Sequence, residues 1–285
     1  MSATFMDGAL LAGELRNSYK ARVAELAREG VVAGLGTILV GDDGPSANYV
    51  AMKHRDCEEI GIASFGRHLP SSATHQEVLE AVREMNHDPR VDAFLVQVPL
   101  PSGLPESEIL AAVSPDKDVD GLHPMNLGRL ALGRPGPLPC TPAGIVALLQ
   151  HYDVTIEGRE VVIIGRGLTI GRPLSLLMSL NCSGGNAAVT VVHSKVPNLA
   201  SIVQRADIVI AAVGVPGIVT AAMVKEGAVV VGAGTSFQGK RLLSDLADDV
   251  ADVASLITPR IGGVGPMTRA MLLSNTIDAA ARRAK

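Results

Sequence analysis

The sequence is poor in aromatic residues and in cysteine, and each shortage limits what the chain can be. Among its 285 residues are three tyrosines, four phenylalanines and no tryptophan. Core volume must therefore come from Val, Leu, Ile and Ala, a composition that favours parallel strands buried on both faces. The three cysteines, Cys57, Cys140 and Cys182, lie far apart, with no CxxC pair and no metal-ligand spacing. We therefore expect no disulfide framework and no metal site, and this cysteine usage fits a reducing compartment.

Runs of basic charge and long apolar runs are also missing. The formal net charge is -4, so nucleic acid and anionic membranes are not expected as main partners. No stretch reaches the roughly 18 apolar residues of a membrane span. The first residues lack the basic start and the apolar run of a signal peptide. We therefore expect a cytoplasmic protein.

The sequence does contain a regular alternation of strand and helix patterns. Apolar residues make up 47% of the chain and charged residues 19%, which is enough for a core in one large or two ordinary domains. The alternation predicts an α/β fold in which helices cover both faces of a parallel sheet. We expect two such units, joined near residue 140. The predicted strands are 34–43, 63–69, 92–101, 160–165, 187–194, 207–214 and 228–234, and the predicted helices are 15–30, 46–61, 75–86, 106–113, 143–152, 171–180, 199–206, 220–227 and 267–284.

Local signals fix some boundaries. Ser46 is predicted to cap its helix and Gly61 to end it. The proline- and glycine-rich segment 116–142 has little periodicity and is expected to be a loop, and long loops in compact domains are usually functional.

A glycine-rich turn follows the strand predicted at 160–165. Gly165, Gly167 and Gly171 have the spacing G-x-G-x-x-x-G, one residue longer than the usual dinucleotide fingerprint. Between a strand and a helix, such glycines let the backbone approach a pyrophosphate, and the helix N-terminus supplies amides. The alternative is that the glycines serve the tight turn only.

The end of the next strand carries no acidic residue. NAD-binding proteins usually place an acid there to hold the ribose hydroxyls, whereas this strand ends with His193, Ser194 and Lys195. With Arg166 from the glycine turn, these side chains suit a 2'-phosphate, so NADP is favoured over NAD. The alternative is that Arg166 and Lys195 are solvated surface charges.

Two further features of the first half indicate a ligand site. Tyr49 and Lys53 lie four residues apart and share one helix face. Lys53 is either a snorkelling lysine with its head in water or a catalytic lysine beside an aromatic wall. Gln97 lies at the carboxyl end of a buried strand, where α/β proteins bind ligands. The alternative is that neighbouring backbone groups hold this amide.

The acidic segment before Gly121 and the later Cys140 leave several functions open. Asp116, Asp118 and Asp120 could bind Ca2+, but no downstream Glu completes an EF-hand pattern. Such carboxylates could instead cap or turn the chain, or one could accept two hydrogen bonds from the amidine edge of a ring. Cys140 could be a nucleophile, although a packing cysteine is favoured.

Six ordered motifs resemble those of one enzyme family. They are SANYVAMKHRDCEEIGI, VQVPLP, DVDGLHPMNLGRL, PCTPAG, GRGLTIGRP and GGVGPMTRAMLLSNT. In order and approximate spacing they are similar to the bifunctional methylenetetrahydrofolate dehydrogenase/methenyltetrahydrofolate cyclohydrolase family. The resemblance implies a homodimer of chains with two domains flanking a cleft. Residues 1–140 would form the substrate (folate) and catalytic domain, completed by the C-terminal helix 267–285, and residues 141–266 a Rossmann-like NADP-binding domain.

The resemblance also implies roles for individual residues. Lys53 would be the catalytic lysine, hydrogen-bonded to Gln97, which helps to position substrate or water. Tyr49 would stack along the aminobenzoyl ring of the folate, and Asp120 would hold the pterin edge. The remaining residues match cofactor contacts (Gly165, Arg166, Gly167, Gly171, Ser194 and Thr235) and the loop near substrate and nicotinamide (Gly262, Gly263 and Pro266).

The implied activity has two steps in one-carbon metabolism and purine biosynthesis. NADP-dependent oxidation of 5,10-methylenetetrahydrofolate gives 5,10-methenyltetrahydrofolate, and hydrolysis then gives 10-formyltetrahydrofolate. Removal of hydride leaves a cation that the substrate's own nitrogens stabilise, so this step needs orientation more than an acid. Hydrolysis needs proton transfer, for which Lys53 is the candidate, directly or through Gln97.

Three departures from the family pattern keep alternatives open. Gly167 stands where the G-R-S turn has Ser, Gly232 where Asp is expected, and Ile261 where Pro is expected. One alternative is a family member with a single activity, a cyclohydrolase with a weakened dehydrogenase. A shikimate- or amino-acid-type NADP dehydrogenase would not predict D-V-D-G, and a non-enzymatic NADP-sensing or scaffold protein requires Lys53 to be dispensable.

Overall fold

The computed structural model describes residues 3–239 and 241–284, which form two compact units. The six-stranded unit contains the residues up to Ala12 and Thr141–Thr268, and the three-stranded unit contains Gly13–Cys140 and the residues from Arg269 onwards. Each unit has a parallel sheet with helices. The predicted α/β class is therefore confirmed. Within the described residues, no helix combines the length and apolarity needed to cross a membrane.

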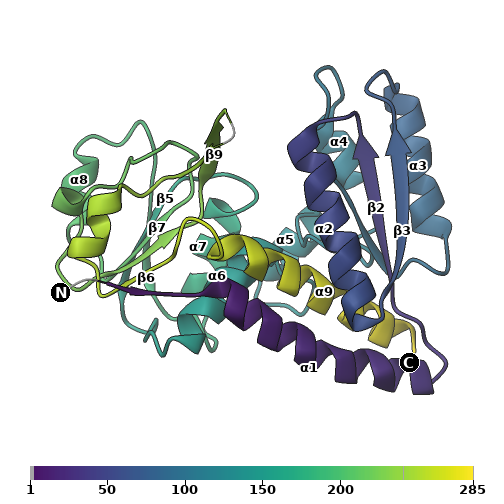
Figure 1. Ribbon diagram of the computed structural model, residues 1–285, viewed down its shortest axis with the longest axis horizontal. Helices are drawn as coiled ribbons and strands as arrows, with labels where there is room; N and C mark the ends of the chain where they lie inside the picture. The colour runs from purple at the N-terminus through teal and green to yellow at the C-terminus, as the bar shows by residue number, and fades with distance from the viewer. Residues whose placement is uncertain (1–2, 240, 285) are drawn as a thin grey trace. The chain divides into compact units, whose positions relative to one another are not determined.

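The three-stranded unit is built on the sheet β3-β2-β4. Its strands are β2 (Gly34–Val40), β3 (Ala63–Leu69) and β4 (Ala93–Val96), and both neighbouring pairs are parallel. Every residue of β2 is buried. Figure 1 shows β2 and β3 between two helices, α2 (Gly44–Ile60) and α3 (His75–His87). Two shorter helices follow, α4 (Glu106–Ala111) and α5 (Pro124–Ala131).

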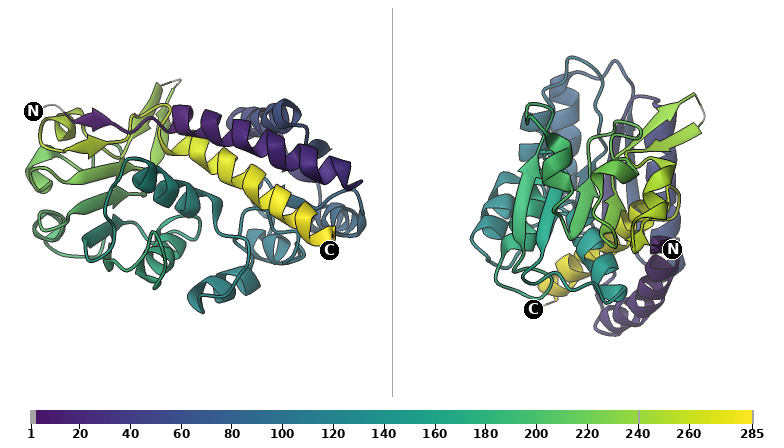
Figure 2. Two further views of the ribbon diagram at one scale, coloured as in Figure 1. Left: turned by 90° about the horizontal axis from the view of Figure 1, so that it is seen from below. Right: turned by 90° about the vertical axis from the view of Figure 1, so that its left-hand side faces the viewer.

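Two long helices each belong partly to both units. They are α1 (Gly8–Arg28) and α9 (Val264–Arg283). Within the three-stranded unit these helices lie side by side (Figure 2), and Nη2 of Arg22 donates to Oδ1 of Asp278 at 2.6 Å. Segments from opposite ends of the chain therefore pack together in this unit.

The six-stranded unit has the strand order β1-β11-β8-β7-β5-β6, and every neighbouring pair is parallel. Its core consists almost entirely of Val, Ile, Leu and Ala, as the shortage of aromatic residues predicts. The strands are β1 (Thr4–Phe5), β5 (Glu160–Ile164), β6 (Ala188–Val192), β7 (Ile208–Ala211), β8 (Val229–Gly232) and β11 (Leu256–Ile257). The helices are α6 (Cys140–His151), α7 (Gly171–Ser179) and α8 (Leu199–Val203), and β9 (Thr235–Gln238) pairs with β10 (Arg241–Ser244) in an antiparallel hairpin.

The predicted start of α2 was wrong by a few residues. Asp43 caps the helix, and its Oδ2 accepts a hydrogen bond from the backbone N–H of Ser46 at 2.9 Å. Both residue types are good caps, so the local pattern alone did not distinguish them. At the other end, Gly61 stops the helix in the left-handed region with φ 87°, as predicted.

Two other element predictions were also wrong. The segment 116–142 contains α5, because Pro124 occupies the first turn of that helix and the ring of His123 accepts the N–H of Met125. Proline breaks a helix interior but suits its first turn. The helix predicted at 220–227 is a short 3-10 turn, Ala221–Met223, since no side chain caps it and Val224 is already extended.

The first residues lie in a different unit from the one our boundary implied. Thr4 and Phe5 pair with Leu256 and Ile257, so β1 extends the six-stranded sheet. A two-residue edge strand is too short to show a period in the sequence.

Candidate functional site

Lys53 lies on the buried side of α2. The residue is 6% exposed, whereas Tyr49, one turn earlier, is 39% exposed. Nζ of Lys53 donates to Oε1 of Gln97 at 3.0 Å. The amide nitrogen of Gln97 in turn donates to the carbonyl oxygen of Val98 at 2.8 Å, which fixes the amide with its oxygen toward the lysine. The ammonium is thus held by a protein acceptor, and the snorkelling interpretation is wrong.

The parallel register brings Gln97 and Asp120 to the same edge of the sheet. Phe94 of β4 forms a parallel bridge with Asp118. Gln97 follows that bridge by three residues on one strand and Asp120 by two on the other. Because parallel strands end at one edge, both side chains belong to the carboxyl edge, where α2 also starts after β2. The contact between Lys53 and Gln97 lies at this edge.

The carboxyl group of Asp120 is perturbed by its surroundings. The solvent-exposed area of Asp120 shows that this residue is half-buried. The protein atoms packed around the carboxyl nevertheless raise its pKa, and the charge of Asp118 adds to this effect. The Lys53 ammonium acts in the opposite direction. An acid and a basic group therefore influence each other here, as is common in catalytic sites.

Asp118 turns the chain. Its carboxylate accepts hydrogen bonds from the backbone N–H of Gly121 at 3.1 Å and of His123 at 2.8 Å, and from the side chain of Asn126 at 2.9 Å. The turn interpretation of this acid is therefore confirmed. The calcium interpretation gains no support, since the described part of the chain contains no group of three or more His, Cys, Asp or Glu that could hold a metal.

Cys140 is a packing residue. It is 3% exposed, and its thiol donates to the carbonyl oxygen of Val119 at 3.2 Å. Burial raises the pKa of this thiol well above its usual range, and the charge of Asp120 raises it further. A nucleophilic thiolate is disfavoured by both effects.

The glycine turn of the six-stranded unit is closely packed. Gly165 has φ 120°, and a Cβ at Gly171 would collide with the carbonyl oxygen of Gly165. At Gly167, in contrast, a Cβ would meet nothing within 4 Å. The turn therefore needs glycine at two of its three positions, and it joins the carboxyl end of β5 to the start of α7.

Arg166 and Ser194 follow neighbouring strands at equivalent positions. Ile164 of β5 pairs with Val192 of β6, and each of the two side chains comes two residues later. Both residues are exposed. A cation and a hydroxyl thus stand at the same edge of the sheet as the glycine turn, which suits a phosphate group.

The other predicted residues of this unit are close to strand ends as well. Thr235 begins β9, three residues after β8. Gly262 has φ 85°, and its carbonyl oxygen accepts the N–H of Ala9 at 2.8 Å. A Cβ at Gly263 would come within 2.6 Å of the carbonyl oxygen of Pro259, so this loop needs its glycines. Pro266 lies in the first turn of α9.

The structure accommodates the glycine at position 232. A Cβ there would come within 2.9 Å of Oγ of Ser244 and 3.0 Å of Leu246. The carboxylate of the neighbouring Asp245 is fully buried and accepts the N–H groups of Val213 and Gly214 at 2.7 and 3.2 Å. Asp245, which directly follows β10, thus holds the backbone of the loop after β7.

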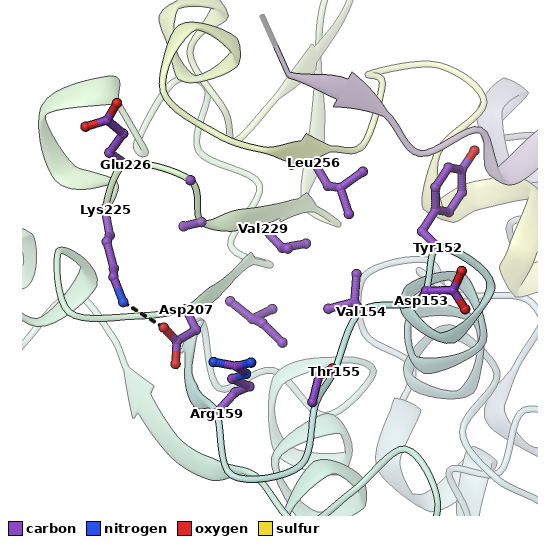
Figure 3. A pocket seen from close by; sticks show the side chains of 13 residues that line it. Tyr152, Asp153, Val154, Thr155, Arg159, Asp207, Lys225, Glu226, Val229 and Leu256 are labelled. Atoms are coloured by element: carbon purple, nitrogen blue, oxygen red, sulfur yellow. Dashed lines mark hydrogen bonds and ion pairs between the residues drawn. The ribbon is translucent and has the colours of Figure 1, made fainter. Parts of the chain in front are cut away.

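A cavity of about 320 Å³ lies elsewhere in the six-stranded unit (Figure 3). Ile208, Val229 and Leu256, which begin β7, β8 and β11, line it, so it opens at the amino edge of the sheet. In Figure 3 the carboxylate of Asp207 points toward Lys225, and the two are 2.7 Å apart. None of the predicted site residues lines this cavity, and it is not the candidate site.

Two residues near Lys53 and Asp120 were not predicted. Asn275 of α9 donates to the carbonyl oxygens of Val119 and Leu138. His54 lies 3.0 Å from Oγ1 of Thr37, and burial lowers its pKa, with a further contribution from Lys53. Both belong to motifs in the sequence, but their contacts join segments far apart in the chain, so spacing alone gave no signal.

Comparisons with known proteins find relatives that cover both units of the chain. The catalytic-domain model of the tetrahydrofolate dehydrogenase/cyclohydrolase family matches residues 6–120, and the NAD(P)-binding-domain model of that family matches residues 139–284. The chain is 55% identical to the bifunctional protein FolD of Syntrophotalea carbinolica, over 100% of this chain and 98% of that protein.

Two solved structures are similar over nearly the whole chain. The bifunctional FolD of Campylobacter jejuni is 39% identical with a TM-score of 0.94, covering 99% of this chain and 100% of that chain. The dehydrogenase-cyclohydrolase of Trypanosoma brucei, solved with NADP cofactor and an inhibitor, is 35% identical with a TM-score of 0.94, covering 100% and 99%.

Proposed function

Because the chain belongs to the tetrahydrofolate dehydrogenase/cyclohydrolase family, we propose that it oxidises 5,10-methylenetetrahydrofolate with NADP and hydrolyses the product. The oxidation gives 5,10-methenyltetrahydrofolate, and the hydrolysis gives 10-formyltetrahydrofolate. The observation that carries the proposal is the buried Lys53 ammonium held by Gln97 at 3.0 Å. A shikimate- or amino-acid-type dehydrogenase is not favoured, since both family models match.

The three-stranded unit supplies the folate-binding and catalytic side chains. Asp120 accepts hydrogen bonds from the pterin edge, a charge-assisted pairing that needs the ionised carboxylate. Tyr49 offers its exposed ring to the aminobenzoyl group. These contacts orient the methylene carbon, and orientation is the main requirement of the hydride step because the substrate nitrogens stabilise the resulting cation.

The six-stranded unit holds NADP. Its residues fit this group: Gly165 and Gly171 leave a cradle that a Cβ would fill, and Arg166 and Ser194 stand together at the strand ends to contact the 2'-phosphate. Gly167 and Thr235 follow strand ends at the same edge of the sheet, and Gly262, Gly263 and Pro266 match the family's segment near substrate and nicotinamide. When bound, NADP accepts the hydride from the methylene carbon.

Lys53 and Gln97 act in the hydrolysis. A water molecule adds to the methenyl carbon and gives one proton to Lys53, which acts as the neutral amine and becomes the ammonium. The hydroxyl proton of the adduct then passes to the leaving nitrogen as its carbon–nitrogen bond breaks, and the formyl group stays on the other nitrogen. Gln97 orients both Lys53 and the water. Since the Gln97 amide is fixed by Val98, the lysine acts from a defined position.

Two further proposals rest on the family resemblance: the chain forms a homodimer, and it serves one-carbon metabolism and purine biosynthesis. Composition, cysteine usage and net charge support the others: the chain works in the cytoplasm, uses no metal, and binds neither nucleic acid nor membranes. Light scattering of the purified protein measures the dimer directly, and a monomeric mass at micromolar concentration would contradict it.

A spectrophotometric assay tests the two activities separately. Absorbance of methenyltetrahydrofolate is followed with purified protein. Its formation from the methylene compound with NADP tests the dehydrogenase, and its accelerated loss without NADP tests the cyclohydrolase. Loss without formation would support a family member with a single activity. Neither signal above buffer would refute the proposed function.

A further inference from the structure

Asn275 joins two separate segments of the three-stranded unit. Its side-chain nitrogen donates to the carbonyl oxygen of Val119 at 2.8 Å and to that of Leu138 at 2.9 Å. Sγ of Cys140 lies 3.5 Å from the same nitrogen. The Asn275 amide therefore donates to two backbone carbonyls. One of these carbonyls belongs to Val119, the residue directly before Asp120.

The two joined segments also contact each other through their backbones. The N–H of Cys140 donates to the carbonyl oxygen of Asp120 at 3.2 Å. Gly121 has φ 70°, and a Cβ at this position would lie 2.6 Å from the backbone nitrogen of Pro139. Such close approach leaves little freedom for the segments to slide. The peptide groups on both sides of Asp120 are thus fixed, one by Asn275 and one by Cys140.

The turn around Asp118 completes this arrangement. Its carboxylate accepts the N–H groups of Gly121 and His123, which lie on the far side of Asp120. Asp120 is therefore the middle of a short segment that is held at every neighbouring position. A carboxylate that receives two hydrogen bonds from a flat ring edge needs this accuracy, because such pairing is directional.

We propose that Asn275 is a positioning residue for Asp120, and that it determines how well the chain binds the pterin edge of its folate substrate. The inference rests on the proposed function. Asn275 acts through the carbonyl of Val119, to which its amide donates. Its loss removes the amide donor from the carbonyl oxygens of Leu138 and Val119, leaves Val119 with only the Cys140 thiol as donor among the described residues, and lets the segment before Asp120 move.

The test compares Asn275→Ala with Asn86→Ala. Asn86 is an equally half-buried amide of the same unit, which donates to Ala112 at 2.8 Å and accepts from Ser114 at 2.8 Å. Both variants lose two amide hydrogen bonds, so similar losses of stability are expected. Only Asn275→Ala should raise the KM for methylenetetrahydrofolate, by about tenfold, the size expected from two hydrogen bonds of ordinary net strength. The KM for NADP should be unchanged in both.

Two further variants separate positioning from stability. Asn275→Gln keeps the amide donors and should recover part of the folate KM, whereas Asn275→Asp places a carboxylate against two carbonyls and should be worse than alanine. If Asn275→Ala does not fold, the test rests on Asn275→Gln. This variant should raise the folate KM two- to threefold relative to wild type (about 0.5 kcal/mol). An unchanged folate KM in the variants that fold, or equal effects of Asn86→Ala, would overturn the inference. An inactive wild-type protein would overturn the proposed function instead.

Discussion

At the scale of single residues, Lys53 carries the clearest prediction. Lys53→Met should lower the hydrolysis rate by about 10²- to 10⁴-fold, the usual contribution of a proton-transfer group. The fold should persist, because methionine fills a similar volume and needs no hydrogen-bond partner. The rate is measured as loss of methenyltetrahydrofolate, and circular dichroism reports the fold.

Lys20→Met is a suitable control for this change. Lys20 is an exposed lysine of α1 that contacts Asn17 and Glu59. The control should hydrolyse at the wild-type rate. Equal rates for the two variants would remove Lys53 from the mechanism.

The raised pKa of Asp120 predicts an acid limb in folate binding. Burial raises this pKa and Lys53 partly offsets the rise. Since the ionised form accepts the pterin hydrogen bonds, the KM for the folate should increase as pH falls, and at a higher pH than for an ordinary aspartate with a pKa of about 3.9. In Lys53→Met the opposing cation is gone, so the limb should move to still higher pH.

This pH dependence is measured in the dehydrogenase assay, which Lys53→Met should retain. The KM for NADP serves as the internal control and should stay flat over the same range. A limb that moves to lower pH in Lys53→Met, or a parallel rise of the KM for NADP, would contradict the assignment to Asp120.

At the scale of elements, the glycine turn between β5 and α7 has one position, Gly167, at which a substitution should strengthen NADP binding. Gly167→Ser has open space for its side chain and should supply a phosphate-binding hydroxyl. We expect the KM for NADP to fall by about tenfold, the effect of one charge-assisted hydrogen bond. Gly171→Ala should instead raise the KM for NADP, because its Cβ would collide with Gly165. Steady-state kinetics with varied NADP measures both variants, and a higher KM for NADP in Gly167→Ser would contradict the prediction.

The C-terminal end of α9 is tied to the sheet of the three-stranded unit. Nε of Arg283 lies 2.7 Å from Oδ1 of Asp92, whose side chain is 2% exposed. The same carboxylate accepts the N–H of Gly34 at 2.8 Å, where β2 begins. Arg283→Ala should therefore lower the free energy of unfolding by about 1–3 kcal/mol, at the low end because the guanidinium itself is partly exposed.

Arg282→Ala is the control for that element. Within the described residues, the side chain of Arg282 makes one hydrogen bond, to the backbone carbonyl oxygen of Asp116 at 3.2 Å. Its replacement should cost about 0.5 kcal/mol or less. Urea melts of both variants provide the measurement, and equal midpoints would refute the structural role of Arg283.

At the scale of the whole molecule, neither unit is one continuous piece of chain. The three-stranded unit takes contacts from four positions along α9: Arg269 with Asp56, Asn275 with Val119, Asp278 with Arg22, and Arg283 with Asp92. Residues 13–140 alone should therefore fail to unfold cooperatively. A fusion of 13–140 to 269–285 through a flexible linker should restore a sigmoidal urea melt by circular dichroism. A cooperative melt of 13–140 alone would contradict this prediction.

The sequence predicted the sheets well and the connections less well. Strands β2 and β5 were found because buried parallel strands form apolar runs. The helix at α5 was missed since its proline was interpreted as a loop signal, and β1 and β11 are too short to show a period. Lys53, Gln97 and Asp120 stay proposed site residues. The hydrogen bonds of Asn275 could not be predicted, because contacts between distant segments leave no local pattern.

The shared helices α1 and α9 have a consequence for synthesis on the ribosome. Domains usually fold in the order in which they emerge. Here the six-stranded unit has all its segments once residue 268 is made, whereas the three-stranded unit still lacks α9 beyond that point. Residues 13–140 thus wait for about 130 residues of intervening chain, or roughly 6–26 s at about 5–20 residues per second. The unit that takes most of its residues from the first half of the chain is therefore the one that is completed last.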